Sequence, residues 1–174
     1  MGNKTTEFVT SKELFEATKK VLHKRGIELN RVAELVYDLQ LPYTPELQME
    51  TCVTAVNEVL MKRELQHAIL VGAELDRLAE EGKLSEPLQS LVAADEGLFG
   101  VDETIAIGAT FTYGSIAVTT FGYLDKEKKG IIKELDTTED SVNTFMDDLV
   151  GSIAANAAAR VAHRTRDDLE REQN

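Results

Sequence analysis

A long segment of this chain, from Thr104 to Leu124, contains no charged residue, and a second uncharged segment lies between Leu149 and Arg160. The first has the length of about 20 residues that a bilayer-crossing helix needs. It also contains five threonines, one serine and three glycines. These make it too polar for stable membrane insertion, but they suit close packing between helices inside a protein. We therefore expect both segments to be buried in the core, and we assign no transmembrane helix.

Local preferences in the first uncharged segment conflict. Its Thr, Val, Ile, Phe and Tyr residues favour a β-strand, but apolar and polar residues do not alternate as they do in a half-exposed strand. Small residues at Ala106, Gly108, Ala109 and Gly114, together with the length of the segment, fit a buried helix better. We predict a helix rich in small residues at the centre of the fold.

The rest of the chain shows helical periodicity interrupted by glycine and proline. Helices are predicted from Ser11 to about His23, over residues 29–39, 45–60, 69–82 and 85–91, and from Thr138 to about Arg166. Thr44 before Pro45, and Thr138 before Glu139 and Asp140, have the composition of helix starts. The chain is thus predicted to be all-α, with one multi-helix bundle spanning residues 1–174.

The composition limits the cellular compartment and the kinds of binding partner that we expect for this protein. The formal net charge of -12 argues against nonspecific nucleic-acid binding and repels an anionic membrane, so any membrane contact is expected to be peripheral. The single cysteine, Cys52, cannot form an intramolecular disulfide, and the N-terminus lacks the apolar core of a signal peptide. We expect a cytoplasmic protein, either free or peripheral to the inner face of the membrane. Helices rich in small residues are also compatible with a homo-oligomer.

Acidic residues bracket the uncharged segments at three places: Asp102 with Glu103, Asp125, and Asp147 with Asp148. Burying several carboxylates beside apolar segments costs free energy unless a cation or hydrogen bonds compensate. A hard divalent ion, typically Mg²⁺, suits ligands that are all oxygen and also accepts phosphate oxygens. The pattern therefore points to metal binding and phosphate chemistry.

Each acidic position also has an ordinary structural interpretation. Asp102 and Glu103 open a predicted helix, where the helix dipole favours acidic side chains. Asp147 and Asp148 lie off the apolar stripe of their helix, so a solvated ridge is an alternative. Asp125 would be an ordinary helix-end residue, although a carboxylate near a helix C-terminus is unfavourable.

A lysine-rich polar connection is predicted from Lys126 to Lys133. Lys128 and Lys133 lie in it and either meet a phosphate or remain solvated. The three histidines show no metal-ligand spacing, and the sequence has no Walker loop, dinucleotide fingerprint or phosphatase loop of cysteine and arginine. The acidic clusters are therefore the strongest candidates for a catalytic or metal-binding site.

Three motifs, in order along the chain, resemble those of phosphatidylglycerophosphatase A proteins. The acidic pair stands in GVDETIAIG, the family's Leu-Asp-x-x-Lys segment ending in another Asp resembles YLDKEKKGIIKELD, and its Asp-Asp helix resembles FMDDLVGSIAA. The resemblance covers about Gly97 to Ala159. It implies a magnesium-dependent enzyme of phospholipid metabolism, which removes the terminal phosphate of phosphatidylglycerophosphate and leaves phosphatidylglycerol.

The resemblance also implies roles for the matching residues. The expected metal ligands are Asp102, Glu103, Asp147 and Asp148. Asp125 would be a further ligand or the base that orients the attacking water, and Lys128 would neutralise phosphate charge. Asp136, at the end of the second motif, completes the expected catalytic group. A covalent aspartyl-phosphate is an alternative mechanism.

The chain departs from membrane-embedded members of that family. They carry several apolar spans, an aromatic residue before the acidic pair and prolines after the lysine, where this chain has Val101, Lys129 and Ile131. These differences indicate a soluble, helical branch. Two other functions stay open: an all-helical, magnesium-dependent nucleotide pyrophosphohydrolase, whose paired Glu-x-x-Glu ligands are not evident here, and a noncatalytic helical protein that binds a metal ion or a partner.

Overall fold

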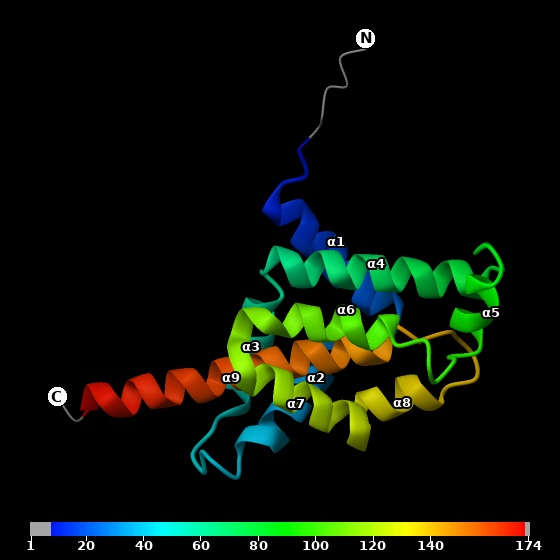
Figure 1. Cartoon of the computed structure of the whole chain (residues 1–174). Coiled ribbons are helices and arrows are strands. Elements are labelled where there is room, and N and C mark those ends of the chain that lie inside the picture. The colour runs from blue at the N-terminus through cyan, green and yellow to red at the C-terminus, as the bar shows by residue number, and fades with distance from the viewer. Residues whose placement is uncertain (1–7, 173–174) are drawn as a thin grey trace.

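The computed structural model describes residues 8–172, and this part of the chain is a bundle of helices without a β-strand (Figure 1). The helices are α1 (Ser11–Lys24), α2 (Leu29–Gln40), α3 (Met49–Val59), α4 (Arg63–Glu80), α5 (Leu88–Ala93), α6 (Val101–Thr110), α7 (Gly114–Glu127), α8 (Ile131–Thr137) and α9 (Met146–Glu172). A 3-10 turn, η1 (Phe111–Tyr113), joins α6 to α7. The all-α prediction is confirmed.

The N-terminal half of the long helix α9 lies at the centre of the bundle, and its C-terminal part extends out of it (Figure 1). It contacts α2, α3, α4, α6, α7 and α8 (Figure 1). Every residue of α9 from Met146 to Ala159 is buried, including the five alanines of the second uncharged segment. The prediction that this segment is buried is therefore confirmed.

Two glycines allow neighbouring helices to approach α9 closely. A Cβ atom added at Gly72 of α4 would lie 2.4 Å from Leu149 Cδ1 and 2.9 Å from Phe145 Cβ, so only glycine fits at this position. A Cβ atom at Gly151 would lie 3.4 Å from Phe121 Cε2 of α7, which is an ordinary van der Waals distance. The contact at Gly72 therefore holds the N-terminal half of α9 close to α4 and leaves no room for a side chain there.

The first uncharged segment differs from its prediction. It is helical, as predicted, with a break at η1, but the prediction that it is buried is wrong. α6 and α7 run antiparallel over α9 and form a hairpin (Figure 1). The hairpin buries one face, with Phe121 and Leu124, whereas Phe111 is 67% exposed and Ile116 is 42% exposed. By length and composition Val101–Glu127 would suffice for a membrane span, with 28% of its most apolar window buried.

Two predicted helix starts are also wrong. Thr138 follows α8 instead of opening the last helix, because α9 begins only at Met146. The predicted polar connection from 126 to 133 is shorter than expected, since α7 continues to Glu127 and α8 begins at Ile131. α3 begins at Met49 and not at Pro45, because residues 41–46 form turns. These differences arise where tertiary contacts determine the helix start.

Candidate active site

The candidate site lies where the ends of four helices meet at one end of the bundle (Figure 1). The start of α6 carries Asp102 and Glu103, the end of α7 is followed by Lys128 and carries Asp125, α8 carries Asp136, and the start of α9 carries Asp147 and Asp148. The predicted site residues therefore come together although they are separated by up to a quarter of the chain.

Lys128 lies among four of these carboxylates. Its Nζ atom is 2.7 Å from Asp147 Oδ2, 2.8 Å from Asp125 Oδ1, 3.2 Å from Asp148 Oδ1 and 4.0 Å from Asp136 Oδ1. The backbone of Lys128 has φ 41°, in the left-handed region, and caps the end of α7. The alternative that Lys128 is simply a solvated loop residue is excluded, because only 24% of its side chain is exposed. Lys133, by contrast, is exposed on α8.

A second group consists of Asp102, Glu103 and Asp148, whose candidate ligand oxygens lie within 4.8 Å of one another. Asp102 is 5% exposed and Asp148 is 3% exposed, which excludes a solvated ridge for the latter. Asp102 Oδ1 and Glu103 Oε2 are buried without a hydrogen-bond partner among the described residues. Buried carboxylate oxygens without a donor carry a large desolvation cost, which a cation would offset. Oxygen-only donors of this kind match a hard divalent ion.

Burial raises the pKa values of three carboxyl groups in the site. Desolvation, together with the neighbouring Glu103, raises the pKa of Asp102 to about 7. Desolvation raises the pKa of Asp147 to about 6 although Lys128 opposes it, and desolvation with the charge of Asp147 raises the pKa of Asp148 to about 8. Burial alone would lower the pKa of Lys128, but the surrounding carboxylates, led by Asp147, raise it overall. A bound cation would therefore compete with protons for these carboxylates near neutral pH.

One residue that positions the site was not identified from the sequence. Asp76 of α4 is fully buried, and its carboxylate accepts hydrogen bonds from the backbone N–H groups of Phe145, at 3.1 Å, and Met146, at 3.0 Å. These donors are the residue before α9 and the first residue of α9, so Asp76 caps the start of the helix. Desolvation raises the pKa of Asp76 to about 7 despite these bonds. The sequence did contain a signal for Asp76, because this acidic residue lies among the apolar residues of the helix predicted over residues 69–82.

Asp95 is a second residue that was not singled out, since it lies in no motif of the sequence. It precedes α6 with φ 47°, an uncommon backbone conformation for aspartate. Partial desolvation raises its pKa, whereas the charge of Lys128 opposes that shift. Asp95, Asp136 and Thr144 line a pocket of ≈ 550 Å³. Of the seven predicted site residues, Asp136 is the one that lines this pocket.

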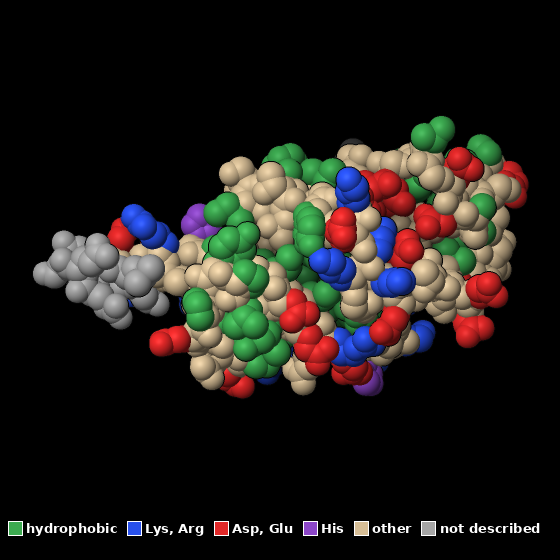
Figure 2. All heavy atoms as spheres, turned by 90° about the horizontal axis from the view of Figure 1, so that it is seen from below, with side chains coloured by type: hydrophobic (Ala, Val, Ile, Leu, Met, Phe, Trp, Pro, Cys, Tyr) green, Lys and Arg blue, Asp and Glu red, His purple; other side chains and the backbone are tan. Residues whose placement is uncertain are grey.

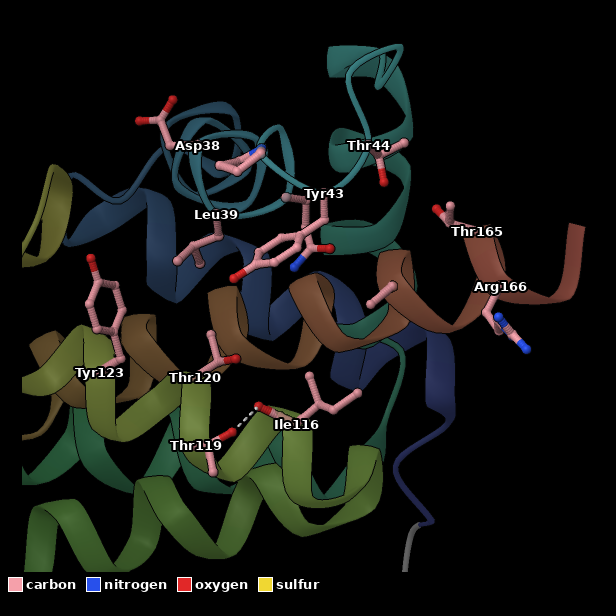
Figure 3. A pocket seen from close by; sticks show the side chains of 13 residues that line it. Asp38, Leu39, Tyr43, Thr44, Ile116, Thr119, Thr120, Tyr123, Thr165 and Arg166 are labelled. Carbon is pink, nitrogen blue, oxygen red and sulfur yellow. Dashed lines mark hydrogen bonds between the residues drawn. The ribbon is translucent and has the colours of Figure 1, made fainter. Parts of the chain in front are cut away.

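Another pocket, of ≈ 660 Å³, lies between α2, the α2–α3 loop, α7 and the C-terminal half of α9 (Figure 3). Tyr43 and Tyr123 project into it from opposite walls, and Thr119 and Thr120 line it from α7. Asp38 and the distal Arg166 are the charged side chains that line it, and none of the carboxylates of the candidate site does. The larger pocket therefore lacks the carboxylates that would hold a metal ion.

Comparisons with known proteins identify relatives that share nearly the whole chain. The uncharacterized protein YpjQ of Bacillus subtilis (strain 168) is 50% identical over 95% of this chain and 94% of its own length. The uncharacterized protein YutG of the same organism is 52% identical over 83% of this chain and 88% of its own length. The crystal structure of YpjQ superposes with a TM-score of 0.88 over 91% of this chain and 99% of that one.

A further solved structure is that of the low temperature requirement C protein from Listeria monocytogenes, which is 46% identical and superposes with a TM-score of 0.87. It covers 90% of this chain and 99% of its own. Residues 26–163 match the sequence model of the family described as Phosphatidylglycerophosphatase A, and this range contains all seven predicted site residues. The chain therefore belongs to the phosphatidylglycerophosphatase A family.

Proposed function

We propose that this protein is a magnesium-dependent phosphomonoesterase that hydrolyses phosphatidylglycerophosphate to phosphatidylglycerol and phosphate. The observation that carries the proposal is the convergence of four helix ends on one cluster, in which buried carboxylates surround Lys128. Family membership supports phosphatase chemistry of this kind.

The proposed metal ligands are carboxylates that lie close together at the start of α6 and the start of α9. Asp102, Glu103 and Asp148 offer three oxygens within 4.8 Å of one another, and Asp147 is adjacent to them in sequence. A bound Mg²⁺ would supply positive charge to phosphate oxygens and lower the pKa of water. The two oxygens without hydrogen-bond donors, Asp102 Oδ1 and Glu103 Oε2, fit this use because a structural role would leave their desolvation uncompensated.

The remaining residues would act on the phosphate and on water. Lys128 is held by carboxylates, and its ammonium group would donate hydrogen bonds to the phosphate and offset negative charge on the departing oxygen. The side chains of Asp125 and Asp136 are about one-third exposed, at 35% and 32%, so either reaches both Lys128 and solvent. Asp125 is the better candidate for orienting the attacking water, because it lies closer to Lys128.

The proposal specifies the class of substrate and excludes nucleic acid as a partner. The substrate is a phosphomonoester on a lipid headgroup. The net charge of -12 argues against nucleic acid as a partner, and it makes a local cation necessary for any anionic ligand. We infer a cytoplasmic protein that contacts the inner face of the membrane at most peripherally.

The test is phosphate release from phosphatidylglycerophosphate in detergent micelles, with Mg²⁺ or with a chelator. The comparison is between the wild-type chain, Asp102→Asn and the matched control Asp38→Asn, which changes an exposed aspartate away from the site. We expect release that requires Mg²⁺, is lost in Asp102→Asn and is retained in Asp38→Asn.

Two other results would assign the site to one of the alternative functions. Nucleoside triphosphates that yield pyrophosphate, with no release from the lipid, would instead assign the site to a pyrophosphohydrolase. No turnover of any phosphate ester by a folded sample that still binds Mg²⁺ would assign it to a noncatalytic metal-binding protein.

A further inference from the structure

Lys128 differs from its neighbours Lys126 and Lys129 in its surroundings. Both neighbours are exposed, whereas the side chain of Lys128 is partly buried. On the face of the molecule in Figure 2, basic side chains lie at the surface among acidic ones, which is the ordinary arrangement of solvated charges. The ammonium group of Lys128 instead contacts three carboxylates of the candidate site, at 2.7, 2.8 and 3.2 Å. This lysine is a cation that the chain itself places inside the acidic site.

The turn that carries Lys128 is fixed on both sides of the lysine. Lys128 adopts φ 41°, and its backbone N–H donates a hydrogen bond of 2.8 Å to the carbonyl group of Leu124, which ends α7. Two residues later, Gly130 lies so close to α2 that a Cβ atom there would be 2.9 Å from Leu35 Cδ2. These contacts hold the position from which Lys128 reaches the carboxylates. A chelator that removes a metal ion would leave this positive charge in place.

The spacing of the oxygens around Lys128 suits an ammonium group. Its two shortest contacts, 2.7 Å to Asp147 and 2.8 Å to Asp125, match the ~2.7–2.9 Å of a charged N–H···O hydrogen bond. Mg²⁺ would hold such oxygens much closer, at about 2.0–2.1 Å. Within residues 8–172, the one group of three acidic side chains with ligand oxygens within 4.8 Å of one another is that of Asp102, Glu103 and Asp148. The site therefore contains one group spaced for a metal ion and another spaced for an ammonium group.

Asp148 belongs to both groups. Its carboxylate is one of the three that cluster without a cation, and its Oδ1 atom lies 3.2 Å from Lys128 Nζ. Enzymes that use two metal ions on phosphate esters place two positive charges about 3.5–4 Å apart, which stabilise the attacking and the leaving oxygens. A site with one metal group and one ammonium group that share a carboxylate offers the same two charges.

We propose that the ammonium group of Lys128 takes the place of the second metal ion of a two-metal phosphoesterase, so that each chain holds a single divalent ion. The inference rests on the metal site of the proposed function, but it depends neither on the identity of the substrate nor on turnover. Without the ammonium group, Asp125 and Asp147 would lose their closest cation, and buried carboxylates need a replacement for it. Removal of the Lys128 side chain should therefore create a second metal site.

The test counts the Mn²⁺ ions bound to each full-length chain by equilibrium dialysis without substrate, because Mn²⁺ prefers the same oxygen ligands as Mg²⁺. The variants are Lys128→Asn and Lys128→Gly, since both residues tolerate the left-handed backbone at this position. The matched control is Lys133→Asn on exposed α8. We expect one ion for the wild type and the control, and two for each Lys128 variant. Electron paramagnetic resonance should show that these two ions are magnetically coupled, which distinguishes them from an ion bound elsewhere.

Two results would overturn the role of Lys128. One is a wild-type chain that binds two coupled Mn²⁺ ions, and the other is a single ion in both Lys128 variants, with circular dichroism showing that they are folded. The wild-type count stays decisive even where a variant does not fold. A wild type that binds no Mn²⁺ would contradict the proposed function itself, whereas two ions together with phosphate release would retain that function and overturn this inference alone.

Discussion

The start of α9 and the outer face of the α6–α7 hairpin distribute their side chains in opposite ways. At the start of α9, Asp147 and Asp148 are 4% and 3% exposed, although they are charged groups. On the hairpin, Phe111 is 67% exposed in a segment without any charge. Burial therefore does not follow hydrophobicity in either region.

The difference arises from how many neighbours each helix has. α9 is enclosed by six other helices, whereas the hairpin packs one face on the bundle and leaves the other uncovered. Buried carboxylates persist at the start of α9 because Lys128 and backbone donors compensate part of their desolvation. Enclosure by many neighbours thus buries charged groups at the start of α9, whereas the lack of a neighbour leaves apolar side chains of the hairpin exposed.

The largest expected effect comes from removing one carboxylate of the buried group. Asp148→Asn should lower kcat/KM for the phosphate ester by about 1,000-fold, because charge stabilisation of the reacting phosphate is lost. The thermal midpoint of the metal-free variant should equal or exceed that of the wild type above about pH 8, where the wild-type carboxyl is deprotonated and a buried charge is removed. Kinetics and calorimetry on one sample check both statements, and a variant that simply melts earlier would contradict them.

Removing the ammonium group of Lys128 should have the second-largest effect. Lys128→Met leaves Asp147 and Asp148 without their closest cation and should lower the free energy of unfolding by about 3 kcal/mol at neutral pH. Chemical denaturation measures this change, and Lys133→Met on exposed α8 is the matched control. Equal stability of the two variants would mean that the carboxylates do not depend on Lys128.

A substitution at the close contact between α4 and α9 should have a smaller effect on stability. Gly72→Ala places a methyl group 2.4 Å from Leu149 Cδ1 and should cost about 2 kcal/mol of unfolding free energy. Urea denaturation measures it. A neutral substitution would show that α9 shifts freely, and the site geometry would then depend less on this contact.

Stability of the metal-free protein should fall as pH rises. Burial raises the pKa values of Asp102, Asp147 and Asp148 to about 7, 6 and 8, above the unfolded value near 3.9. The folded state therefore holds more protons than the unfolded state from about pH 4 to about pH 8. Their stabilisation is complete below the unfolded pKa and is lost as pH rises through the folded values, by up to about 1.4 kcal/mol per pH unit for each carboxyl.

Denaturation in chelator at about pH 5 and about pH 8 measures this slope, and Asp148→Asn should make it shallower. Mg²⁺ should stabilise the wild type more at the higher pH, where the carboxylates are already deprotonated. A stability that increases toward pH 8 in chelator would contradict the assignment of buried, proton-binding carboxyls.

The smallest effect tests the uncovered face. Gly122→Ala should raise the unfolding free energy of the dilute protein by about 0.5 kcal/mol, because alanine favours the helix and its methyl group meets nothing. This is the opposite sign to Gly72→Ala. Urea denaturation of the two variants side by side measures the contrast, and a loss of stability in both would show that the hairpin face is already covered.

The sequence pointed to residues that the fold brings together, but it predicted burial less well. The seven site residues were identified because the acidic positions, Lys128 and the family motifs are local features of the chain. Asp76 and Asp95 were missed because their importance depends on contacts with residues far away in sequence, such as Phe145 for Asp76. The start of α9 was misplaced for the same reason, since the carboxylate that caps it belongs to α4.

The sequence by itself determined the helical class, the family and the residues available for chemistry, because periodicity, capping patterns and motifs are encoded within short stretches. Only the tertiary structure decided which uncharged segment is buried. Both segments lack charge, but α9 lies between six helices and the hairpin lies at the surface. It also decided that four helix ends meet around Lys128, since the positions of helices in a bundle depend on side-chain packing such as that at Gly72, which no local pattern specifies.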